Sequence, residues 1–431
     1  MRFRASDVAA ATGGRLVGPD VDIDGAGFDT RTLRRGQLFV PLVAERDGHE
    51  FIAAARDAGA AAYLTSLPAS GGTAIEVDDT LRALMELAAN RRRLFTGTVI
   101  GITGSVGKTS TKDMAWAALA TTVRTAANER SFNNEQGLPT TILNTPDGTE
   151  VLMLEMGMRG FGEISALCRI AAPQVGVVTR VAEAHSDRVG GIDGVARAKS
   201  ELIVALPGDG IAILNGDDQR VRDMRHRTTA VCLLFGESTD ADVRVRDVAL
   251  DELARPSFVV DTPWGSAAVR LSISGRHMVE NAAAALACVG AVGGDIVAGA
   301  AALSSVGLTA MRMQVERARS GAIILNDSYN ANPTSMRAAI DALVDLPAKR
   351  RVAILGVMAE ISDAAAEHRA IARYAVERDI ELIPVGTDLY GVQPPTDAVA
   401  ALGSVSGDDA VLVKGSRVAG LEKLAALLIA G

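Results

Sequence analysis

The sequence has few aromatic residues and few cysteines. Only 3% of its 431 residues are aromatic, although 48% are hydrophobic. The cores must therefore be built mainly from Ala, Val, Leu and Ile, which suits layered parallel α/β structure. The three cysteines, Cys168, Cys232 and Cys288, are far apart and odd in number, which fits neither a disulfide framework nor a clustered metal site. We expect three buried, reduced thiols.

A long apolar run and an excess of positive charge are also absent. The longest apolar stretch, residues 282–294, consists of small residues, ends before Asp295 and is too short to span a bilayer, so it predicts a buried helix. The N-terminus has no segment of signal-peptide type. A net charge of −8 argues against binding nucleic acid or an anionic membrane through bulk electrostatics. We therefore expect a cytoplasmic protein without membrane insertion and without a nucleic-acid partner.

The length and the order of strand-like segments predict an α/β fold with three domains. A chain of 431 residues exceeds the roughly 250 to 300 residues at which a single core usually stops growing. We expect a small N-terminal α/β domain at 1–95, a central domain at 96–308 and a C-terminal domain at 309–431.

Short apolar strands alternate with helical patterns along the second and third domains, which predicts right-handed crossovers and mainly parallel sheets. Strands are expected at 99–102, 151–154, 175–178, 211–214, 322–325, 351–355, 382–385 and 411–413, with an antiparallel hairpin within 257–274. Helices are expected at 79–93, 110–119 and 279–293. The arginines at 91–93 would complement the dipole of the first helix.

A glycine-rich loop lies between the strand at 99–102 and the helix at 110–119. Residues 101–109 read Gly-Ile-Thr-Gly-Ser-Val-Gly-Lys-Thr. In such a loop, backbone N–H groups bind phosphate oxygens, Lys108 neutralises the outer phosphates and the Thr109 hydroxyl binds magnesium. The first glycine of the usual pattern is displaced, since Ile102 occupies its place. The loop predicts a site for ATP.

Side chains that could bind metal or take part in catalysis follow the next two strands. Glu155 comes directly after the strand at 151–154, and a carboxylate beside a phosphate loop is the expected second ligand of magnesium. His185 and Lys199 follow the strand at 175–178. Taken alone, such a histidine or a helical lysine is usually structural or solvated.

Together, these segments resemble the Mur ligase family, whose members add amino acids or a dipeptide to the muramyl precursor of the bacterial cell wall. The matching segments of the central domain are 104–109 (Gly-Ser-Val-Gly-Lys-Thr), 155–157 (Glu-Met-Gly), 183–185 (Glu-Ala-His) and 198–201 (Ala-Lys-Ser-Glu). The resemblance extends over essentially the whole chain. It implies a UDP-binding N-terminal domain, a central P-loop ATPase domain and a Rossmann-like C-terminal domain.

Further segments resemble the family member that adds D-alanyl-D-alanine to UDP-N-acetylmuramoyl-tripeptide. They are 29–31, 36–39, 47–51, 133–139, 326–333 and 413–417, and the run Asp-Ser-Tyr-Asn-Ala-Asn-Pro at 327–333 is the most specific. The resemblance implies an ATP-dependent ligase of peptidoglycan precursor synthesis that works through an acyl phosphate and is usually a monomer.

The resemblance also implies roles for single residues. Lys108, His185 and Lys199 would be catalytic, and a carbamylated Lys199 would serve as an anionic metal ligand. Magnesium ions would be held by Thr109, Glu155, His185 and Lys199. ATP would be bound by Gly104, Ser105, Val106, Gly107, Lys108, Thr109, Ser110, His277, Asn281, Arg312, Asp327, Tyr329, Asn330 and Asn332. The two substrates would be bound by Thr30, Arg31, Asp47, Gly48, His49, Asn133, Asn134, Lys414, Ser416 and Arg417.

The sequence departs from the family pattern at three places. Val357 stands where this ligase usually has Asp, and Arg180 stands where Asn is usual. The loop at 44–47 lacks a residue or two and has Ala where Gly is common. These departures concern the substrate and the fine geometry of the site, not the ATP chemistry.

Two alternatives stay open. A related ligase could use a different amine acceptor, in cell-wall, folylpolyglutamate-like or specialised peptide synthesis, and Val357 and Arg180 favour it. The second alternative is a nucleotide-driven switch, which needs fewer metal ligands than the sequence supplies. The third residue of the accepted peptide, meso-diaminopimelate or lysine, is also open.

Overall fold

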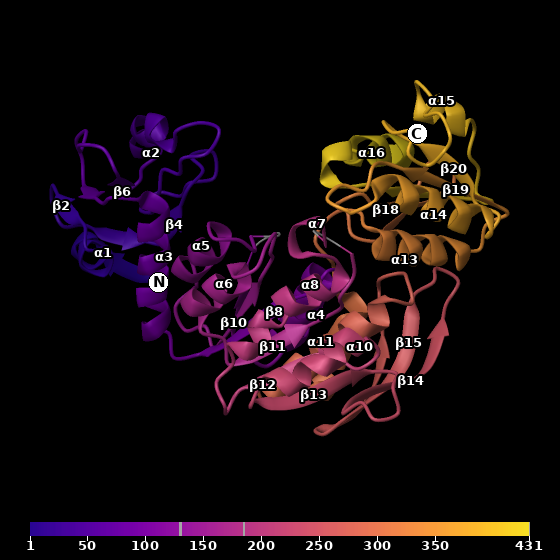
Figure 1. Ribbon diagram of the computed structural model, residues 1–431, viewed down its shortest axis with the longest axis horizontal. Helices are drawn as coiled ribbons and strands as arrows, with labels where there is room; N and C mark the ends of the chain where they lie inside the picture. The colour runs from indigo at the N-terminus through magenta and orange to yellow at the C-terminus, as the bar shows by residue number, and fades with distance from the viewer. Residues whose placement is uncertain (129–131, 184–185, 431) are drawn as a thin grey trace.

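The computed structural model, which describes residues 1–128, 132–183 and 186–430, is organised around three main sheets. We call the parts around them the N-terminal unit (2–94), the central unit (98–305) and the C-terminal unit (314–430). The N-terminal and C-terminal units stand on either side of the central unit, at the indigo and yellow ends of the colour scale in Figure 1.

The N-terminal unit holds a five-stranded sheet in the order β2-β7-β6-β5-β4, with β1 and β3 in a separate antiparallel ribbon. Helix α3 begins after Asp79, whose side chain accepts a hydrogen bond from the Arg82 N–H at 2.9 Å. The elements are β1 (Arg2–Arg4), α1 (Ala5–Thr12), β2 (Arg15–Val17), β3 (Asp22–Asp24), β4 (Ala26–Gly27), β5 (Leu38–Phe39), η1 (Gly48–Phe51), α2 (Ile52–Asp57), β6 (Ala62–Thr65), β7 (Ala74–Glu76) and α3 (Thr80–Leu94).

The central unit is built on a nine-stranded sheet in the order β16-β15-β14-β13-β12-β11-β8-β10-β9. Neighbours from β9 to β14 are parallel, and β14, β15 and β16 form an antiparallel meander at the edge. The strands are β8 (Thr98–Thr103), β9 (Thr125–Ala127), β10 (Val151–Glu155), β11 (Val175–Val178), β12 (Ile211–Asn215), β13 (Val231–Gly236), β14 (Val243–Leu250), β15 (Pro256–Thr262) and β16 (Gly265–Arg270).

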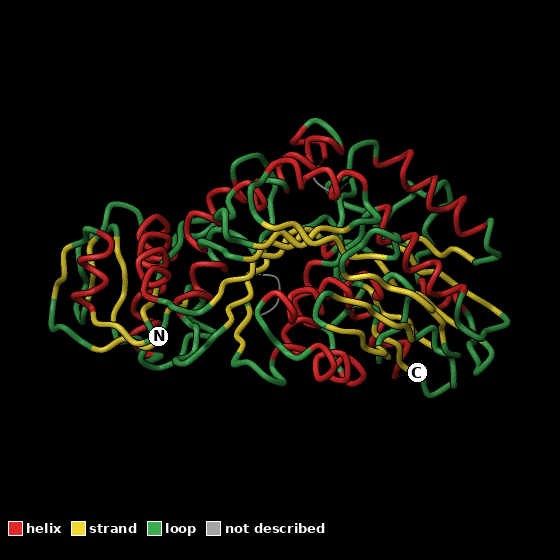
Figure 2. Tube along the Cα trace, turned by 90° about the horizontal axis from the view of Figure 1, so that it is seen from below, coloured by secondary structure: helices red, strands yellow, loops and turns green. Residues whose placement is uncertain are grey.

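Helices cover both faces of this sheet, as the view along its layers shows (Figure 2). Alternate strand residues point to opposite faces, so Ile100 packs in one core with α4, α11 and α12, whereas Val99 packs in the other with α5, α6, α8 and helix α3 of the N-terminal unit. The helices are α4 (Lys108–Leu119), α5 (Gly137–Leu143), α6 (Glu163–Ala171), α7 (Ser186–Val189), α8 (Ile192–Lys199), α9 (Glu201–Val204), α10 (Gln219–Arg222), η2 (Asp223–Arg227), α11 (Met278–Ala291), α12 (Ile296–Ala302) and η3 (Leu303–Ser305).

The C-terminal unit has a five-stranded sheet in the order β17-β18-β21-β19-β20, parallel except for the β17 edge. Pro333 begins α13, and Asn332 caps it by accepting from the Ser335 N–H. The elements are β17 (Gln314–Arg317), β18 (Ile323–Asp327), α13 (Pro333–Val344), β19 (Arg350–Leu355), α14 (Ala364–Val376), β20 (Glu381–Pro384), α15 (Ala398–Leu402), β21 (Asp409–Lys414), η4 (Arg417–Ala419) and α16 (Glu422–Ala430).

The predicted α/β class and mainly parallel sheets are confirmed. The predicted hairpin, β15 and β16, is part of a larger meander that includes β14. Strand β14 is not predicted from the sequence because it has no continuous apolar run. The predicted buried helix is α11, and among the described residues no helix has the length and apolar character needed to cross a membrane.

The expectation of three buried thiols is wrong for one of them. Cys168 and Cys288 are buried, and burial raises the pKa of each thiol to about 12. Cys232 is only partly buried, because it lies near the outer end of β13, where the strand begins exposed.

Arg92 joins the N-terminal unit to the central unit. Its side chain is buried and donates to the carbonyl oxygens of Ala171, at 2.6 Å, and Ala172, at 2.9 Å. These carbonyls lie at the C-terminal end of α6, where the helix dipole attracts a cation. The arginines at 91–93 are predicted to complement the dipole of their own helix. Arg92 also complements the dipole of a second helix, α6, through a contact that no local pattern indicates.

We expect Arg92→Ala to lower the free energy of unfolding by about 2 to 3 kcal/mol, because it leaves the buried Ala171 carbonyl without this donor and removes a second hydrogen bond, to Ala172. Arg93 is exposed, so the control Arg93→Ala should change stability by less than about 0.5 kcal/mol. Urea unfolding followed by circular dichroism measures both. Equal stability of the two variants would contradict the structural role of Arg92.

Candidate functional site

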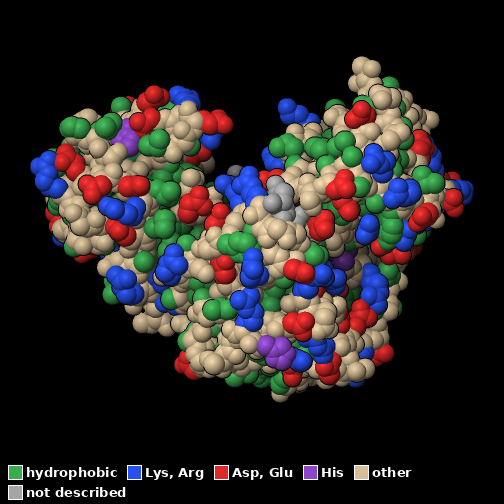
Figure 3. Space-filling view, in the orientation of Figure 1, with side chains coloured by type: hydrophobic (Ala, Val, Ile, Leu, Met, Phe, Trp, Pro, Cys, Tyr) green, Lys and Arg blue, Asp and Glu red, His purple; other side chains and the backbone are tan. Residues whose placement is uncertain are grey.

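The surface is hollowed between the N-terminal and C-terminal units, above the central unit (Figure 3). A cavity of about 1080 Å³ is lined by residues of all three units. It receives the ends of β8, β10 and β11, and the carboxyl ends of parallel strands are where α/β sheets bind ligands. Its wall includes these residues predicted from the sequence: Gly104, Ser105, Val106, Gly107, Lys108, Thr109, Ser110, Asn133, Asn134, Glu155, Lys199, His277, Asn281, Arg312, Asp327, Tyr329, Asn330, Asn332, Lys414, Ser416 and Arg417.

The glycine-rich loop leads from β8 directly into α4. Gly104 and Gly107 have φ angles of 154° and 83°, and a Cβ atom on Gly104 would lie 1.9 Å from the Thr179 hydroxyl oxygen. These positions therefore require glycine. Helix α4 begins at Lys108, so its unpaired N–H groups face the loop and form an anion site.

Lys108 is held back against its own loop. Its Nζ donates to the Gly104 carbonyl oxygen at 2.7 Å. Burial lowers the pKa of Lys108, and the nearby Glu155 carboxylate opposes this shift. A phosphate group in the loop would offer this cation a stronger acceptor than the carbonyl.

Glu155 is the buried carboxylate of the site. It ends β10 with 1% of its surface exposed. Its Oε2 accepts from the Thr109 hydroxyl at 2.8 Å, and its Oε1 accepts from Asn133 Nδ2 at 2.8 Å. A hydroxyl and a carboxylate side by side are oxygen ligands of the kind that Mg²⁺ prefers, so the donor set fits a magnesium ion.

Lys199 is the last residue of α8 and is buried in the cavity wall. Burial lowers its pKa well below the ordinary value, and the charge of Lys108 lowers it further. Among the described residues, no hydrogen-bond acceptor contacts its Nζ. A lowered pKa increases the fraction of the lysine that carries a neutral, nucleophilic amine.

His185, the remaining predicted metal ligand, lies outside the described residues. Within the described part of the chain, no cluster of three or more His, Cys, Asp or Glu residues is arranged to hold a metal. The metal ligands predicted from the sequence include a threonine and a lysine besides Glu155, so they do not form a cluster of these four residue types.

The segment that joins the central and C-terminal units brings a second cation to the loop. Arg312 donates from Nη2 to the Thr109 hydroxyl at 3.2 Å, and its guanidinium lies 4.2 Å from the ring centre of Tyr329. The flanking residues Met311 and Met313 have φ angles of 64° and 46°, a strained conformation for methionine. The backbone thus holds Arg312 toward the phosphate loop.

The C-terminal unit adds a buried lysine. Lys414 ends β21, forms an ion pair with Asp327 and donates to the Asn330 carbonyl oxygen at 2.9 Å. Ser416 donates to the Ala331 carbonyl oxygen at 3.2 Å. The segment after β18 and the segment after β21 therefore form one cluster facing the central unit.

Helix α11 presents His277 and Asn281 to the cavity. Burial lowers the pKa of His277 to about 4, so its ring is neutral near pH 7. Asn281 accepts from the Thr111 hydroxyl at 3.3 Å, and its Oδ1 would lie 2.4 Å from a Cβ on Gly107. The amide is therefore packed against the phosphate loop.

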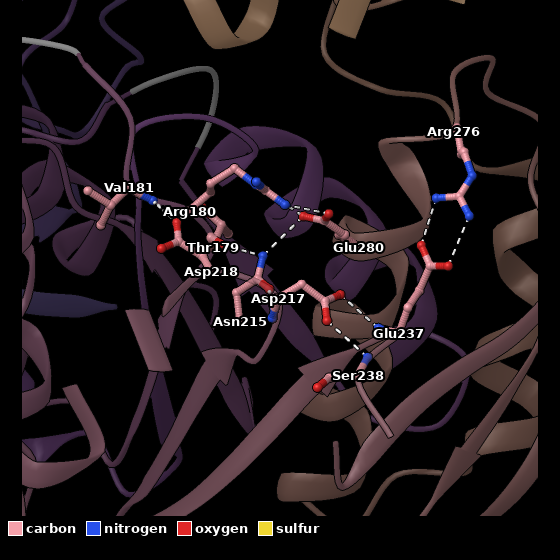
Figure 4. Close-up of polar contacts among 10 residues, drawn as sticks. All are labelled: Thr179, Arg180, Val181, Asn215, Asp217, Asp218, Glu237, Ser238, Arg276 and Glu280. Carbon is pink, nitrogen blue, oxygen red and sulfur yellow. Dashed lines mark hydrogen bonds and ion pairs between the residues drawn. The ribbon is translucent and has the colours of Figure 1, made fainter. Parts of the chain in front are cut away.

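Two arginine–glutamate pairs lie around the N-terminal end of α11 (Figure 4). Arg180 pairs with Glu280 at 2.5 Å, and Arg276 pairs with Glu237 at 2.7 Å. Arg180 and Glu280 line the cavity. No local sequence pattern indicates a role for Glu280, since its partner is 100 residues away.

The predicted substrate residues of the N-terminal unit lie outside the cavity wall. Arg31 is bound to Asp29, and His49 Nδ1 lies 2.6 Å from Asp47 Oδ1. A Cβ on Gly48 would lie 2.5 Å from the Leu42 backbone nitrogen, so glycine is required there. Thr30 is partly exposed in the same unit.

Val357, one of the departures from the family pattern, lies in the loop after β19. Its carbonyl oxygen accepts from the Ser416 N–H at 2.9 Å, and the Ala359 N–H donates to Ser416 Oγ at 2.9 Å. The backbone of this loop is thus held against the cluster after β21, although the usual carboxylate is missing.

The chain is similar to known proteins over most of its length. The Mur ligase middle domain matches residues 102–289, and the glutamate ligase domain of Mur ligases matches residues 311–417. The UDP-N-acetylmuramoyl-tripeptide--D-alanyl-D-alanine ligase of Mycobacterium bovis is 38% identical over 94% of this chain and 91% of its own.

Two solved structures have the same architecture. MurF from Acinetobacter baumannii superposes with a TM-score of 0.87 at 28% identity, over 100% of this chain and 99% of its own. MurF ligase from Thermotoga maritima in complex with ADP superposes with a TM-score of 0.81 at 27% identity, over 94% of this chain and 96% of its own. The phosphate loop, the buried carboxylate and these matches agree, and the chain belongs to the Mur ligase family of ATP-dependent ligases.

Proposed function

We propose that the protein joins D-alanyl-D-alanine to UDP-N-acetylmuramoyl-tripeptide in the cytoplasm, as a step of peptidoglycan precursor synthesis. The observation that carries this proposal is the cavity in which the phosphate loop, the Glu155–Thr109 contact and Arg312 lie together. The names of the similar ligases support the choice of substrates.

The reaction requires activation because a carboxylate has no adequate leaving group. A carboxylate oxygen of the tripeptide attacks the γ-phosphorus of ATP, and ADP leaves with the electrons of the broken P–O bond. Lys108 and Arg312 offset the charge on the transferred group. The amine of D-alanyl-D-alanine then attacks the acyl carbon, loses a proton and expels inorganic phosphate.

Closure of the C-terminal unit over the loop excludes water that would hydrolyse the acyl phosphate. Arg312 and the Lys414–Asp327 pair come from that side of the cavity, and Lys108 comes from the central unit. We assign the ATP contacts to residues of both sides for this reason. His277 and Asn281 would bind the nucleoside end, and Asn133, Asn134, Ser416 and Arg417 the peptide end.

Magnesium, when bound, supplies positive charge that stabilises the transferring phosphoryl group. We assign its ligands to Thr109, Glu155, His185 and a carbamylated Lys199. In forming the carbamate, the neutral Lys199 amine bonds to the carbon of CO₂ and releases one proton, so a neutral group becomes an anion. The lowered pKa of Lys199 supports this assignment because only the neutral amine reacts.

We further propose that UDP is bound by the N-terminal unit, through Thr30, Arg31, Asp47, Gly48 and His49, and that the enzyme is a monomer. The domain limits 1–95, 96–308 and 309–431 belong to the same proposal. Three main sheets, one in each range, support this division.

We expect release of ADP only when ATP, UDP-N-acetylmuramoyl-tripeptide and D-alanyl-D-alanine are all present. Lys108→Ala should lower kcat/KM at least about a hundredfold, because it removes a cation from the transferred phosphate. A coupled ADP assay measures both, with peptides carrying either meso-diaminopimelate or lysine. The exposed Lys423 supplies the control Lys423→Ala, which should keep full activity.

ADP release that needs no acceptor amine would favour a nucleotide switch. ADP release with the tripeptide and a different amine would instead indicate another acceptor. The missing carboxylate at Val357 makes that outcome the natural alternative.

We expect Lys199→Ala to abolish ligation and a small added carboxylate, such as formate, to restore part of it. The wild-type protein should show a carbamate signal in ¹³C NMR after equilibration with labelled CO₂, and Lys199→Ala should lack it. Arg197→Ala, on the same helix and against Phe161, is the matched control and should keep the signal. Full activity of Lys199→Ala would rule out the carbamate.

A further inference from the structure

The two arginine–glutamate pairs near α11 have similar geometry and different surroundings (Figure 4). Arg180 donates from Nη2 to Glu280 Oε1 at 2.5 Å and from Nε to Oε2 at 3.3 Å. Arg276 donates from its two terminal nitrogens to Glu237, at 2.7 and 2.9 Å. Only the first pair contributes to the cavity wall among the described residues, so the second is a natural control.

Arg180 is fixed to the phosphate loop through its backbone. The Ser105 N–H donates to the Arg180 carbonyl oxygen at 2.7 Å. The next residue, Val181, donates its N–H to Asp218 Oδ2 at 2.8 Å. The backbone of Arg180 is therefore tied to the loop that binds phosphate.

Glu280 connects three elements at the same point. Besides pairing with Arg180, it accepts from Asn215 Nδ2 at 3.0 Å, and the same amide nitrogen donates to the Thr179 carbonyl oxygen at 2.8 Å. Glu280 thus ties α11 to the ends of β11 and β12. It directly precedes Asn281, which packs against Gly107.

The charges around this point are mostly negative. Burial acts to lower the pKa of Arg180, but the attraction and hydrogen bonding of Glu280 and the charges of Asp218 and Asp217 outweigh it and raise the pKa. Arg180 is therefore the shared counter-ion of three carboxylates beside a site for a highly anionic nucleotide. Without it, Glu280 would repel that nucleotide, because charges in a partly buried wall are weakly screened.

We propose that Arg180 is a positioning residue of the nucleotide site that neutralises Glu280, so that Glu280 can brace α11 beside the phosphate loop without repelling ATP. This inference rests on the proposed ATP-dependent function. It gives a role to a residue that stands where the family usually has Asn, and it makes the effect of replacing Arg180 depend on whether Glu280 is present.

The test compares Arg180→Asn, Glu280→Ala and the double variant. Arg180→Asn should raise KM for ATP about tenfold, with kcat and KM for the UDP substrate within about twofold of wild type. The increase should shrink at an ionic strength of about 0.5 M. Glu280→Ala should leave KM for ATP unchanged or lower it, and the double variant should return it to within about threefold of wild type.

Arg276→Asn is the matched control, since it breaks a similar pair outside the cavity wall. Its thermal midpoint should fall about as much as that of Arg180→Asn, and its KM for ATP should not change. The proposal is overturned if Glu280→Ala raises KM for ATP as Arg180→Asn does, or if the double variant is no better than Arg180→Asn. It is also overturned if both arginine variants change KM equally.

Binding of a fluorescent ATP analogue should follow the same order as KM. This measurement separates the two proposals, because it does not depend on turnover. A wild-type protein that binds ATP without ligating would refute the proposed function and leave the role of Arg180 testable. If Arg180→Asn fails to fold, Glu280→Ala and the double variant are compared with wild type: KM for ATP within about threefold in both supports the proposal, and a rise of about tenfold in either overturns it.

Discussion

The buried carboxylate of Glu155 is the constraint on which the site depends. A carboxylate with 1% of its surface exposed is tolerated only when its oxygens are satisfied, and here Thr109 and Asn133 satisfy one oxygen each. Thr109 lies in the first turn of the helix after the phosphate loop, and Asn133 lies in the segment before α5. Glu155 therefore fixes the loop and a neighbouring segment in one geometry, with oxygen atoms placed for a divalent cation.

The rest of the site is assembled around this carboxylate by opposing charges. Lys108 lies near it, and Arg312 reaches it from outside the central unit, through Thr109. Such a concentration of cations suits a ligand with many negative charges. On the α11 side of the cavity, Arg180 offsets the charge of Glu280 and of the neighbouring carboxylates, which otherwise predominate there.

Much of the site could be predicted because its signals are local in sequence. The spacing of Gly104 and Gly107 before a helix indicates phosphate binding, and both positions have backbone angles that favour glycine. Contacts made at long range left no such signal. Arg92 caps a helix 79 residues away, and Glu280 binds Arg180 across 100 residues. The expectation that Cys232 is buried fails because an apolar residue type does not reveal which end of a strand is exposed.

The central claim is that the cavity transfers phosphate from ATP to a carboxylate. It is tested most directly with UDP-N-acetylmuramoyl-tripeptide that is labelled with ¹⁸O in the carboxylate to which the phosphoryl group is transferred. An acyl phosphate requires that one labelled oxygen leave with the phosphate, because the bond broken by the amine is the one between acyl carbon and that oxygen. Mass spectrometry should find one ¹⁸O atom in each inorganic phosphate. Unlabelled phosphate, formed at the same rate as the peptide product, would contradict the account.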